Sequence, residues 1–302
     1  MDTSSGPGPP ALAKTPVESR RVEARGLNFQ VLTCGSGDRL ALMLHGFPDD
    51  PGSLVPLMQG LANAGWFCAA PYLRGYGGSD CSPDGNYQMS VLAGDALALI
   101  GALGFDDAML VGHDWGALIG YVAANAAPDK LTHLVTMAVP PVPTLAQNFE
   151  WSQLARSWYI AFFQNPFLPE LAIRHGLIRK LWRDWSPGWE PPPGRIDEVC
   201  ESLSRPGASR AALSYYRSLL VRIPIEFRSH LETRRLSFAP IGVPGLVMAG
   251  ENDGCMGARL FEGATEAFRG RADLKIVRGA GHFLPLEATE VVLQHILDFV
   301  AE

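Results

Sequence analysis

The feature that most constrains the fold is a short turn near the middle of the chain, Gly-His-Asp-Trp-Gly at 112–116. An apolar run at 107–111, typical of a buried strand, precedes the turn, and a run of small residues at 117–127 that predicts a helix follows it. Glycines at both ends suit a sharp strand-to-helix turn, because glycine has no Cβ to obstruct a close backbone approach. The spacing G-x-D-x-G therefore predicts a nucleophile elbow that presents Asp114 where such elbows usually carry serine.

Asp114 differs from serine in its chemistry. A carboxylate is already ionised near neutral pH, and the N-terminus of the following helix favours its negative charge, so Asp114 needs no base for its first step. A carboxylate attacks saturated carbon by displacement and forms an alkyl ester, which suits epoxides and carbon–halogen bonds. The alternative is that Asp114 only caps the N-terminus of the helix.

Polar residues also follow three other predicted strands. The strand at 40–44 leads into His45-Gly46-Phe47-Pro48, and we expect the backbone N–H groups of Phe47 and Trp115 to form an oxyanion hole. The strands at 247–249 and 274–277 are followed by Asp253 and His282. Because sites form where the carboxyl ends of parallel strands meet, we expect all of these groups at one edge of the sheet.

Asp114, Asp253 and His282 occur in the order nucleophile, acid, histidine that hydrolytic triads on such sheets use. The assignment of Asp253 has an alternative, since Asn252-Asp253-Gly254 is also ordinary turn chemistry. The acid can also come from another strand. We keep Asp253 as the predicted partner of His282.

Four motifs together resemble one family. They are His45-Gly46-Phe47-Pro48, Arg74-Gly75-Tyr76-Gly77-Gly78-Ser79, Gly112-His113-Asp114-Trp115-Gly116 and Gly281-His282-Phe283. In this order they resemble the branch of the α/β hydrolases that contains epoxide hydrolases and haloalkane dehalogenases, and the resemblance runs from about Val22 to the C-terminus. It implies an α/β-hydrolase fold, in which helices flank a mostly parallel eight-stranded sheet and a helical cap is inserted.

The resemblance also implies roles for the histidines. His282 would activate a water molecule that attacks the Asp114 ester, while Asp253 would hold the imidazole and stabilise its charged form. His45 is predicted to position its loop, and His113 to support the turn. We expect no metal or other cofactor.

Epoxide hydrolases use cap tyrosines to protonate the opening oxygen, and Tyr159 lies at the position that matches the first of them. A tyrosine O–H can donate to an alkoxide; the alternative is that Tyr159 only packs among its aromatic neighbours. Counting back from Tyr215-Tyr216-Arg217 places the second tyrosine near Cys200, where the sequence has neither Tyr nor His. Cys200 as a substitute donor, inward placement of Tyr215 or Tyr216, and a single tyrosine all remain open.

The function predicted is hydrolysis of small hydrophobic epoxides to vicinal diols, with water as the second reactant. One alternative is a haloalkane dehalogenase, although Phe47 stands where halide pockets of this branch commonly have Asn. Trp115 stands where fluoroacetate-type enzymes have Arg, which argues against an acid substrate. The alternative from another class is a non-catalytic binding protein of the same fold. The predicted pocket residues are His45, Pro48, Trp158, Phe163, Tyr215, Tyr216 and Phe283.

Domain boundaries follow from composition. Residues 1–18 are predicted to be a disordered lead-in, 19–139 and 238–302 the α/β core, and 140–237 the helical cap. The proline cluster at 139–143 marks the first boundary, and five of the seven Trp lie in the predicted cap.

Charge and hydropathy limit the partners. The chain has 302 residues, 47% hydrophobic, and a net charge of -6, so it can bury a large core and offers no basic surface for nucleic acid. A mean hydropathy of +0.06 and the lack of a long apolar run predict no membrane span. The five cysteines are odd in number and widely spaced, so we expect them to be reduced. A cytoplasmic enzyme, monomeric or homodimeric, is the expectation.

Overall fold

The structure is a computed structural model that describes residues 15–220 and 224–302. Residues 1–14 of the predicted lead-in therefore lie outside the described residues. The last part of that lead-in is wrongly assigned, because Val17 and Glu18 already belong to the first strand.

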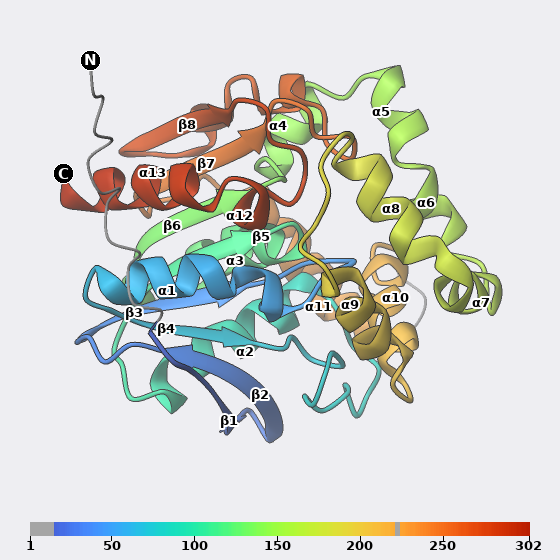
Figure 1. Cartoon of the computed structure of the whole chain (residues 1–302), viewed down its shortest axis with the longest axis horizontal. Coiled ribbons are helices and arrows are strands. Elements are labelled where there is room, and N and C mark those ends of the chain that lie inside the picture. Colours follow the sequence, from blue (N-terminus) through green and yellow to red (C-terminus); the bar gives the residue numbers. More distant parts are fainter. Residues whose placement is uncertain (1–14, 221–223) are drawn as a thin grey trace, which may run out of the picture.

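Eight strands form one sheet (Figure 1). They are β1 (Val17–Ala24), β2 (Leu27–Cys34), β3 (Arg39–Leu44), β4 (Trp66–Pro71), β5 (Ala108–His113), β6 (Leu131–Met137), β7 (Gly245–Gly250) and β8 (Ala272–Val277). Their order in the sheet is β1-β2-β4-β3-β5-β6-β7-β8. The pairs β1–β2 and β2–β4 are antiparallel and every other pair is parallel, which confirms the predicted mostly parallel α/β sheet.

Alternate residues of the central strands face two different helical layers, as the period of two in a strand requires. In β3, Ala41 and Met43 pack with one cluster of apolar side chains, while Leu40 and Leu42 pack with the other. Both layers exclude water, so the parallel strands are apolar on both faces. This double burial explains why they read as continuous hydrophobic runs in the sequence.

Helices cover both faces of the sheet (Figure 1). The layer on the side of Met43 contains α1 (Val55–Asn63), α12 (Leu284–Glu287) and α13 (Thr289–Ala301), and the opposite layer contains α2 (Met89–Ala102), α3 (Trp115–Ala126) and α11 (Pro224–Ser237). Short 3-10 turns lie at η1 (Pro51–Leu54), η2 (Pro128–Lys130), η4 (Ala258–Phe261) and η5 (Ala264–Ala267). The C-terminal segment forms two helices, α12 and α13, because the chain bends at Ala288.

A helical insertion lies between β6 and β7 and is seen at the right of Figure 1. Its helices are α4 (Val142–Gln147), α5 (Trp151–Arg156), α6 (Trp158–Phe162), α7 (Leu168–Ala172), a π-helical turn η3 (Ile173–Leu177), α8 (Ile178–Trp185), α9 (Arg195–Ser204) and α10 (Ala208–Arg217). The predicted cap also included α11, but this helix packs against α2 and α3 of the core. Asn125 of α3, for example, donates from its side-chain amide to the Leu236 carbonyl at 2.9 Å.

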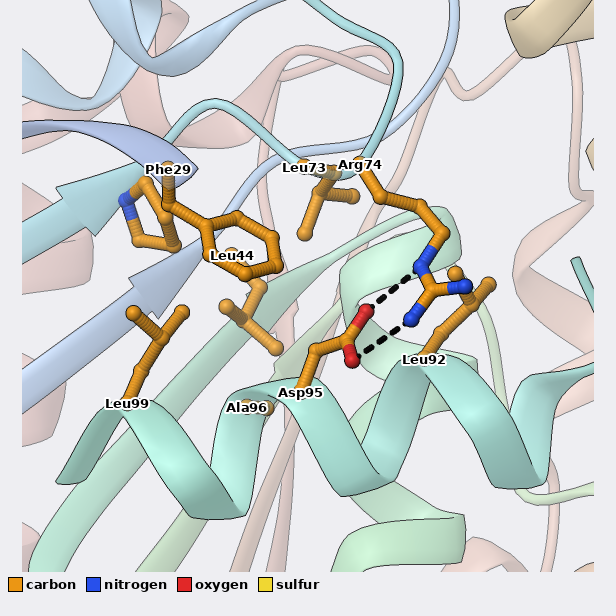
Figure 2. Close-up of a pocket in the computed structure, with 9 residues that line it drawn as sticks. Phe29, Leu44, Leu73, Arg74, Leu92, Asp95, Ala96 and Leu99 are labelled. Carbon is orange, nitrogen blue, oxygen red and sulfur yellow. Dashed lines mark hydrogen bonds and ion pairs between the residues drawn. The ribbon is translucent and has the colours of Figure 1, made fainter. Parts of the chain in front are cut away.

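A buried ion pair fixes the Arg74 motif to the core (Figure 2). Arg74 Nε donates to Asp95 Oδ2 at 2.6 Å and Arg74 Nη2 donates to Asp95 Oδ1 at 2.7 Å. Apolar side chains, Phe29 and Leu44 among them, surround the pair. Burial raises the pKa of Asp95 although Arg74 opposes the shift. This bidentate pair holds the loop after β4 against α2, at the same end of the sheet as the elbow.

Among the described residues, no helix combines the length and the apolar character that crossing a membrane requires.

Candidate active site

Asp114 lies at the turn between β5 and α3, buried and with φ of 54°. A non-glycine residue at positive φ is held there only by its surroundings. Those surroundings require the two glycines of the motif: a Cβ on Gly112 would lie 2.2 Å from the Gly116 carbonyl oxygen, and one on Gly116 would lie 2.1 Å from the Leu44 carbonyl oxygen. The predicted elbow is therefore present, and its strain presents the carboxylate at the edge of the sheet.

The carboxylate of Asp114 does not cap α3 with its side chain, so the alternative of a simple N-cap is wrong. Its Oδ1 instead accepts a hydrogen bond from the backbone N–H of Phe47 at 2.8 Å. Phe47 belongs to the turn after β3 and is joined to Pro48 by a cis peptide bond. One of the two predicted oxyanion donors thus points at the carboxylate; the role of the Trp115 N–H, at the first residue of α3, stays a prediction.

His282 is fully buried between two carboxylates. Its Nδ1 lies 2.9 Å from Asp253 Oδ2, and its Nε2 lies 3.6 Å from Asp114 Oδ2. Burial opposes the charged ring, but the two carboxylates outweigh burial and raise the pKa of His282 to about 10. The structure thus brings together the three residues predicted from the sequence, with the imidazole between Asp253 and Asp114.

Asp253 is fixed by the loop that follows β7. Its Oδ1 accepts from the backbone N–H groups of Cys255 at 2.7 Å and Met256 at 2.8 Å. This leaves Oδ2 for the imidazole of His282. The Asn252-Asp253-Gly254 segment is a turn, as the alternative interpretation predicted, but the side chain of Asp253 also orients His282.

The two other histidines near the elbow are buried. His45 Nε2 accepts from the Leu73 N–H at 3.1 Å, so its proton is on Nδ1, which faces the Gly46 carbonyl at 3.0 Å. Nε2 of His113 lies 2.8 Å from the carbonyl of His282, which joins the elbow to the loop of the base. Burial lowers the pKa of each ring to about 4, so both are neutral at pH 7. The structure therefore gives His45 and His113 the supporting positions expected of them.

Two tyrosines from the insertion lie close to Asp114. Tyr159 of α6 and Tyr216 of α10 are buried, and their rings meet edge to face at 5.7 Å. Burial raises the pKa of both hydroxyls well above the usual value, and the charge of Asp114 adds to the shift. The hydroxyl of Tyr216 has no acceptor among the described residues, because the neighbouring Trp115 side chain can only donate to it. The hydroxyl of Tyr159 lies 3.3 Å from Cys255 Sγ.

The second tyrosine does not lie near Cys200, the position that the sequence comparison indicated. Cys200 lies on α9, half-buried against the apolar core, and it is Tyr216 that reaches inward. Tyr215 does not offer its hydroxyl to the site, because that group donates to the Arg74 carbonyl at 3.0 Å. Adjacent residues on a helix point about 100° apart, so only one of the two can face Asp114.

Most other predicted pocket residues form an aromatic wall. Phe47, Phe163 and Tyr216 meet edge to face, with centroids 5.0 to 5.3 Å apart. Phe283 stacks on Trp182 at 4.0 Å, and the Trp182 indole donates to the Pro48 carbonyl at 2.8 Å. These contacts join α6, α8 and α10 to the loops that carry the triad.

Trp158 is the pocket residue that was wrongly predicted. Its side chain is 41% exposed and packs against Phe162 on the outer face of α6. Because its neighbour Tyr159 points inward, the helical turn directs Trp158 away from Asp114.

Three residues near the base were not predicted. Trp185 lies against the His282 ring at 4.8 Å, its carbonyl accepts from the His282 N–H at 3.1 Å, and Ser186 Oγ lies 2.9 Å from the same N–H. Cys255 contacts Tyr159. The tryptophan enrichment of the insertion was the one available signal, and it did not distinguish Trp185 from packing residues.

Within the described residues, Asp253, Cys255 and His282 come close enough together to be considered as metal ligands. Asp253 Oδ2 and His282 Nδ1 are already paired with each other, and burial raises the pKa of the Cys255 thiol well above its usual value. A bound metal ion would have to break the pair and deprotonate the thiol. The arrangement favours a proton-transfer pair over a metal centre.

Comparisons with known proteins agree with this geometry. Residues 42–289 match the model of the alpha/beta hydrolase fold family. Epoxide hydrolase 3 of Xenopus tropicalis is 31% identical over 299 residues, covering 93% of this chain and 77% of the relative. Epoxide hydrolase A of Mycobacterium tuberculosis is 28% identical, covering 93% of this chain and 96% of the relative.

A solved structure gives the same result. The crystal structure of epoxide hydrolase A from Mycobacterium thermoresistibile superposes with a TM-score of 0.80 at 26% identity, covering 95% of this chain and 98% of that one. With a family match over most of the chain and a buried Asp–His–Asp arrangement at the elbow, the family is settled. The chain belongs to the α/β-hydrolase fold family and, within it, is an epoxide hydrolase-like enzyme.

Proposed function

We propose that the protein opens small hydrophobic epoxides to vicinal diols through a covalent ester on Asp114. Two buried polar atoms support this proposal. Among the described residues the hydroxyl of Tyr216 has no acceptor, since the neighbouring Trp115 side chain can only donate, and His282 Nε2 is 3.6 Å from Asp114 Oδ2, too far for a good hydrogen bond. Buried polar groups are rarely left unpaired, so two such groups beside one carboxylate point to reacting groups that they serve.

The first step is attack on an epoxide carbon. Asp114 Oδ1 is held by the Phe47 N–H, which leaves Oδ2 free to form the new C–O bond. As the ring C–O bond breaks, its oxygen takes a proton from Tyr216 or Tyr159. The raised pKa values of both hydroxyls keep them protonated, and hence able to donate, at neutral pH.

The second step is hydrolysis of the ester. In the free enzyme the carboxylate of Asp114 helps to keep the imidazole of His282 charged. Once Asp114 is an ester its negative charge is gone, so the pKa of His282 falls. The ring then gives its proton to the tyrosinate left by the first step and, now neutral, can accept a proton from water. That water attacks the ester carbonyl, whose oxygen is Oδ1 beside the Phe47 N–H, and the remaining proton of the water passes to the departing oxygen as the diol leaves and Asp114 becomes a carboxylate again.

The aromatic wall fits an apolar substrate. Phe47, Phe163 and Trp185 surround the tyrosines, and a site lined in this way strengthens interactions between charges. The residues facing the nucleophile from the insertion are hydroxyl donors, which serve an alkoxide, and this favours epoxides over halides. We propose that the helices of the insertion act as a cap over this site.

The proposal is tested by incubating the protein separately with styrene oxide and 1-bromobutane. Diol should form and bromide should not; bromide without diol would indicate a dehalogenase, and neither product would favour a binding role. Y159F and Y216F should each lower kcat by about 10-fold or more, and the double variant by roughly 10²–10⁴-fold. Turnover unaffected in the double variant would remove tyrosine from the mechanism.

The ester itself can be observed. D114N should abolish ester formation, whereas H282Q should accumulate the ester as a mass increase on the intact protein. Repeated turnover in isotopically labelled water should place labelled oxygen in Asp114, because attack at the ester carbonyl leaves the water oxygen there. An unlabelled Asp114 after many cycles would exclude the covalent route.

A further inference from the structure

Cys255 occupies an unusual position between the two halves of the site. It lies in the loop after β7, fully buried, and its N–H donates to Asp253 Oδ1 at 2.7 Å. Its carbonyl accepts from Gln153 Nε2 of α5 at 2.8 Å. The backbone of Cys255 is therefore held by the acid of the triad on one side and by the insertion on the other.

The side chain of Cys255 points at a tyrosine. Its Sγ lies 3.3 Å from Tyr159 Oη, within hydrogen-bonding distance for sulfur. The ring of Tyr159 is held by Trp185 at 5.0 Å and Phe163 at 5.6 Å, so the hydroxyl has little freedom to leave this contact by moving the ring. The hydroxyl of Tyr216 has no acceptor among the described residues, because the Trp115 indole beside it can only donate.

The two tyrosines are therefore unequal. We propose that Cys255 is a positioning residue that holds the hydroxyl of Tyr159, leaving Tyr216 as the donor that is free before the epoxide binds. This inference rests on the proposed function. Sulfur is a weak hydrogen-bond partner, so Tyr159 is oriented by Cys255 and can still transfer its hydrogen bond to a stronger acceptor such as an epoxide oxygen.

The chemistry of a thiol suits this position. Burial, followed by the charges of Asp253 and Asp114, raises the pKa of Cys255 well above its usual value. The thiol stays protonated, so it adds no charge beside Asp114 and does not compete with it as a nucleophile for an electrophilic substrate. The same loop thus holds His282 through Asp253 and Tyr159 through Cys255, which joins the base and the acid of the reaction in one segment.

A double-mutant cycle tests the proposal. C255V removes the thiol at similar volume, and C255S restores a polar partner. We expect C255V to lower kcat about 2- to 10-fold, the loss that one weak neutral hydrogen bond corresponds to, with a smaller change in KM. C255S should recover most of the loss.

Combining C255V with Y159F or with Y216F shows through which tyrosine the loss of kcat arises. C255V should change kcat little in Y159F, where the hydroxyl is absent, and should still lower it in Y216F, where Tyr159 is the remaining donor. C200V is the matched control, because Cys200 lies on α9 away from the triad loop, and it should match the wild type. An equal loss in C255V and in C255V/Y159F relative to their parents would overturn the proposal.

A spectroscopic measurement separates this inference from the proposed function. The infrared difference between wild type and C255V isolates the S–H stretching band of Cys255 from those of the other four cysteines. Y159F should shift the band and Y216F should leave it unchanged. A band unmoved in Y159F overturns the contact, whereas a shifted band in a protein that opens no epoxide overturns the proposed function and leaves the contact standing.

Discussion

Asp114 and His282 face each other across 3.6 Å, and the charge of each depends on the other. Asp253 makes the largest favourable contribution to the raised pKa of His282, and the negative charge of Asp114 adds to it. The imidazole is therefore charged when the nucleophile is a free carboxylate. In the proposed reaction His282 becomes a base only after Asp114 has been converted to the ester.

This coupling predicts the titration of His282. D114N removes one negative charge and should lower the pKa of His282 below the value of about 10 in the wild type, and D253N should lower it further. NMR titration of the His282 ring protons measures both shifts. The pKa of His133, which is lowered by burial and by Arg271 and does not depend on Asp114 or Asp253, provides in the same spectra a reference for general changes in the fold. An unchanged His282 pKa in D114N would show that the ester cannot switch on the base.

At the scale of single residues, the triad was predictable from the sequence, whereas the tyrosines proposed to donate the proton were only partly predictable. Asp114, Asp253 and His282 each lie in the turn or loop that follows a strand, and a parallel sheet brings the ends of its strands together. Tyr216 lies on the short helix α10, and the rotation of this helix about its axis depends on how it packs against the core. The hydroxyl of Tyr215 fixes that rotation by donating to the Arg74 carbonyl. No local pattern in the sequence distinguishes these two tyrosines.

The elements of the core were also more predictable than those of the insertion. The central strands, from β3 to β7, are apolar on both faces and alternate with helices, so their positions in the sequence were right to within a few residues. The helices between β6 and β7 are mostly short, and their order over the site is set by contacts with distant loops. The assignment of α11 to the cap was wrong because a helical pattern in the sequence does not reveal that the helix packs on α2 and α3.

Arg195 of α9 makes several buried polar contacts between the insertion and the core. Its guanidinium is 8% exposed and bonds Asp49 Oδ1 at 2.9 Å, Asp50, and Ser53 Oγ at 2.9 Å, in the turn that follows Pro48. Because Phe47 and Pro48 belong to the same turn, this contact also fixes the oxyanion donor. Glu198 bonds the same guanidinium from the solvent side and is 68% exposed.

Removing Arg195 should therefore loosen the insertion. R195M leaves the buried Asp49 and Asp50 without their cationic partner, and such a loss costs roughly 3–5 kcal/mol of unfolding free energy. E198Q is the control and should have little effect, since exposed pairs contribute little. Urea denaturation measures both. Equal stabilities of R195M and wild type would show that the buried cluster does not hold the insertion.

For the whole molecule, buried titratable groups determine how stability depends on pH. The pKa values of His45 and His113 are lowered to about 4 in the folded protein, whereas an exposed histidine titrates near 6.5. Between these values the unfolded chain binds more protons, so stability falls as the pH falls. His282 has the opposite shift, and its contribution is fully present below pH 6.5.

Buried acids oppose this trend within the same window. Burial raises the pKa of Asp49 to about 6, although Arg195 lowers it, so the folded protein binds more protons at Asp49 than the unfolded chain does between about pH 4 and 6. Burial also raises the pKa of Asp95, whereas it lowers the pKa of His133, which acts in the same direction as His45 and His113. Three histidine rings against two carboxyls leave a net loss of stability on acidification.

We therefore expect the free energy of unfolding to decrease from pH 6.5 to pH 4.5, and to decrease more steeply in D49N, in which the opposing group no longer titrates. Urea denaturation at closely spaced pH values gives both slopes, and the comparison uses the slope alone because D49N also alters the pair with Arg195. E198Q, which changes an exposed acid of the same cluster, should follow the wild-type slope. If stability stayed constant or rose on acidification, His45 and His113 would have to be charged in the folded protein. The conclusion that His45 is neutral and accepts from the Leu73 N–H would then be wrong.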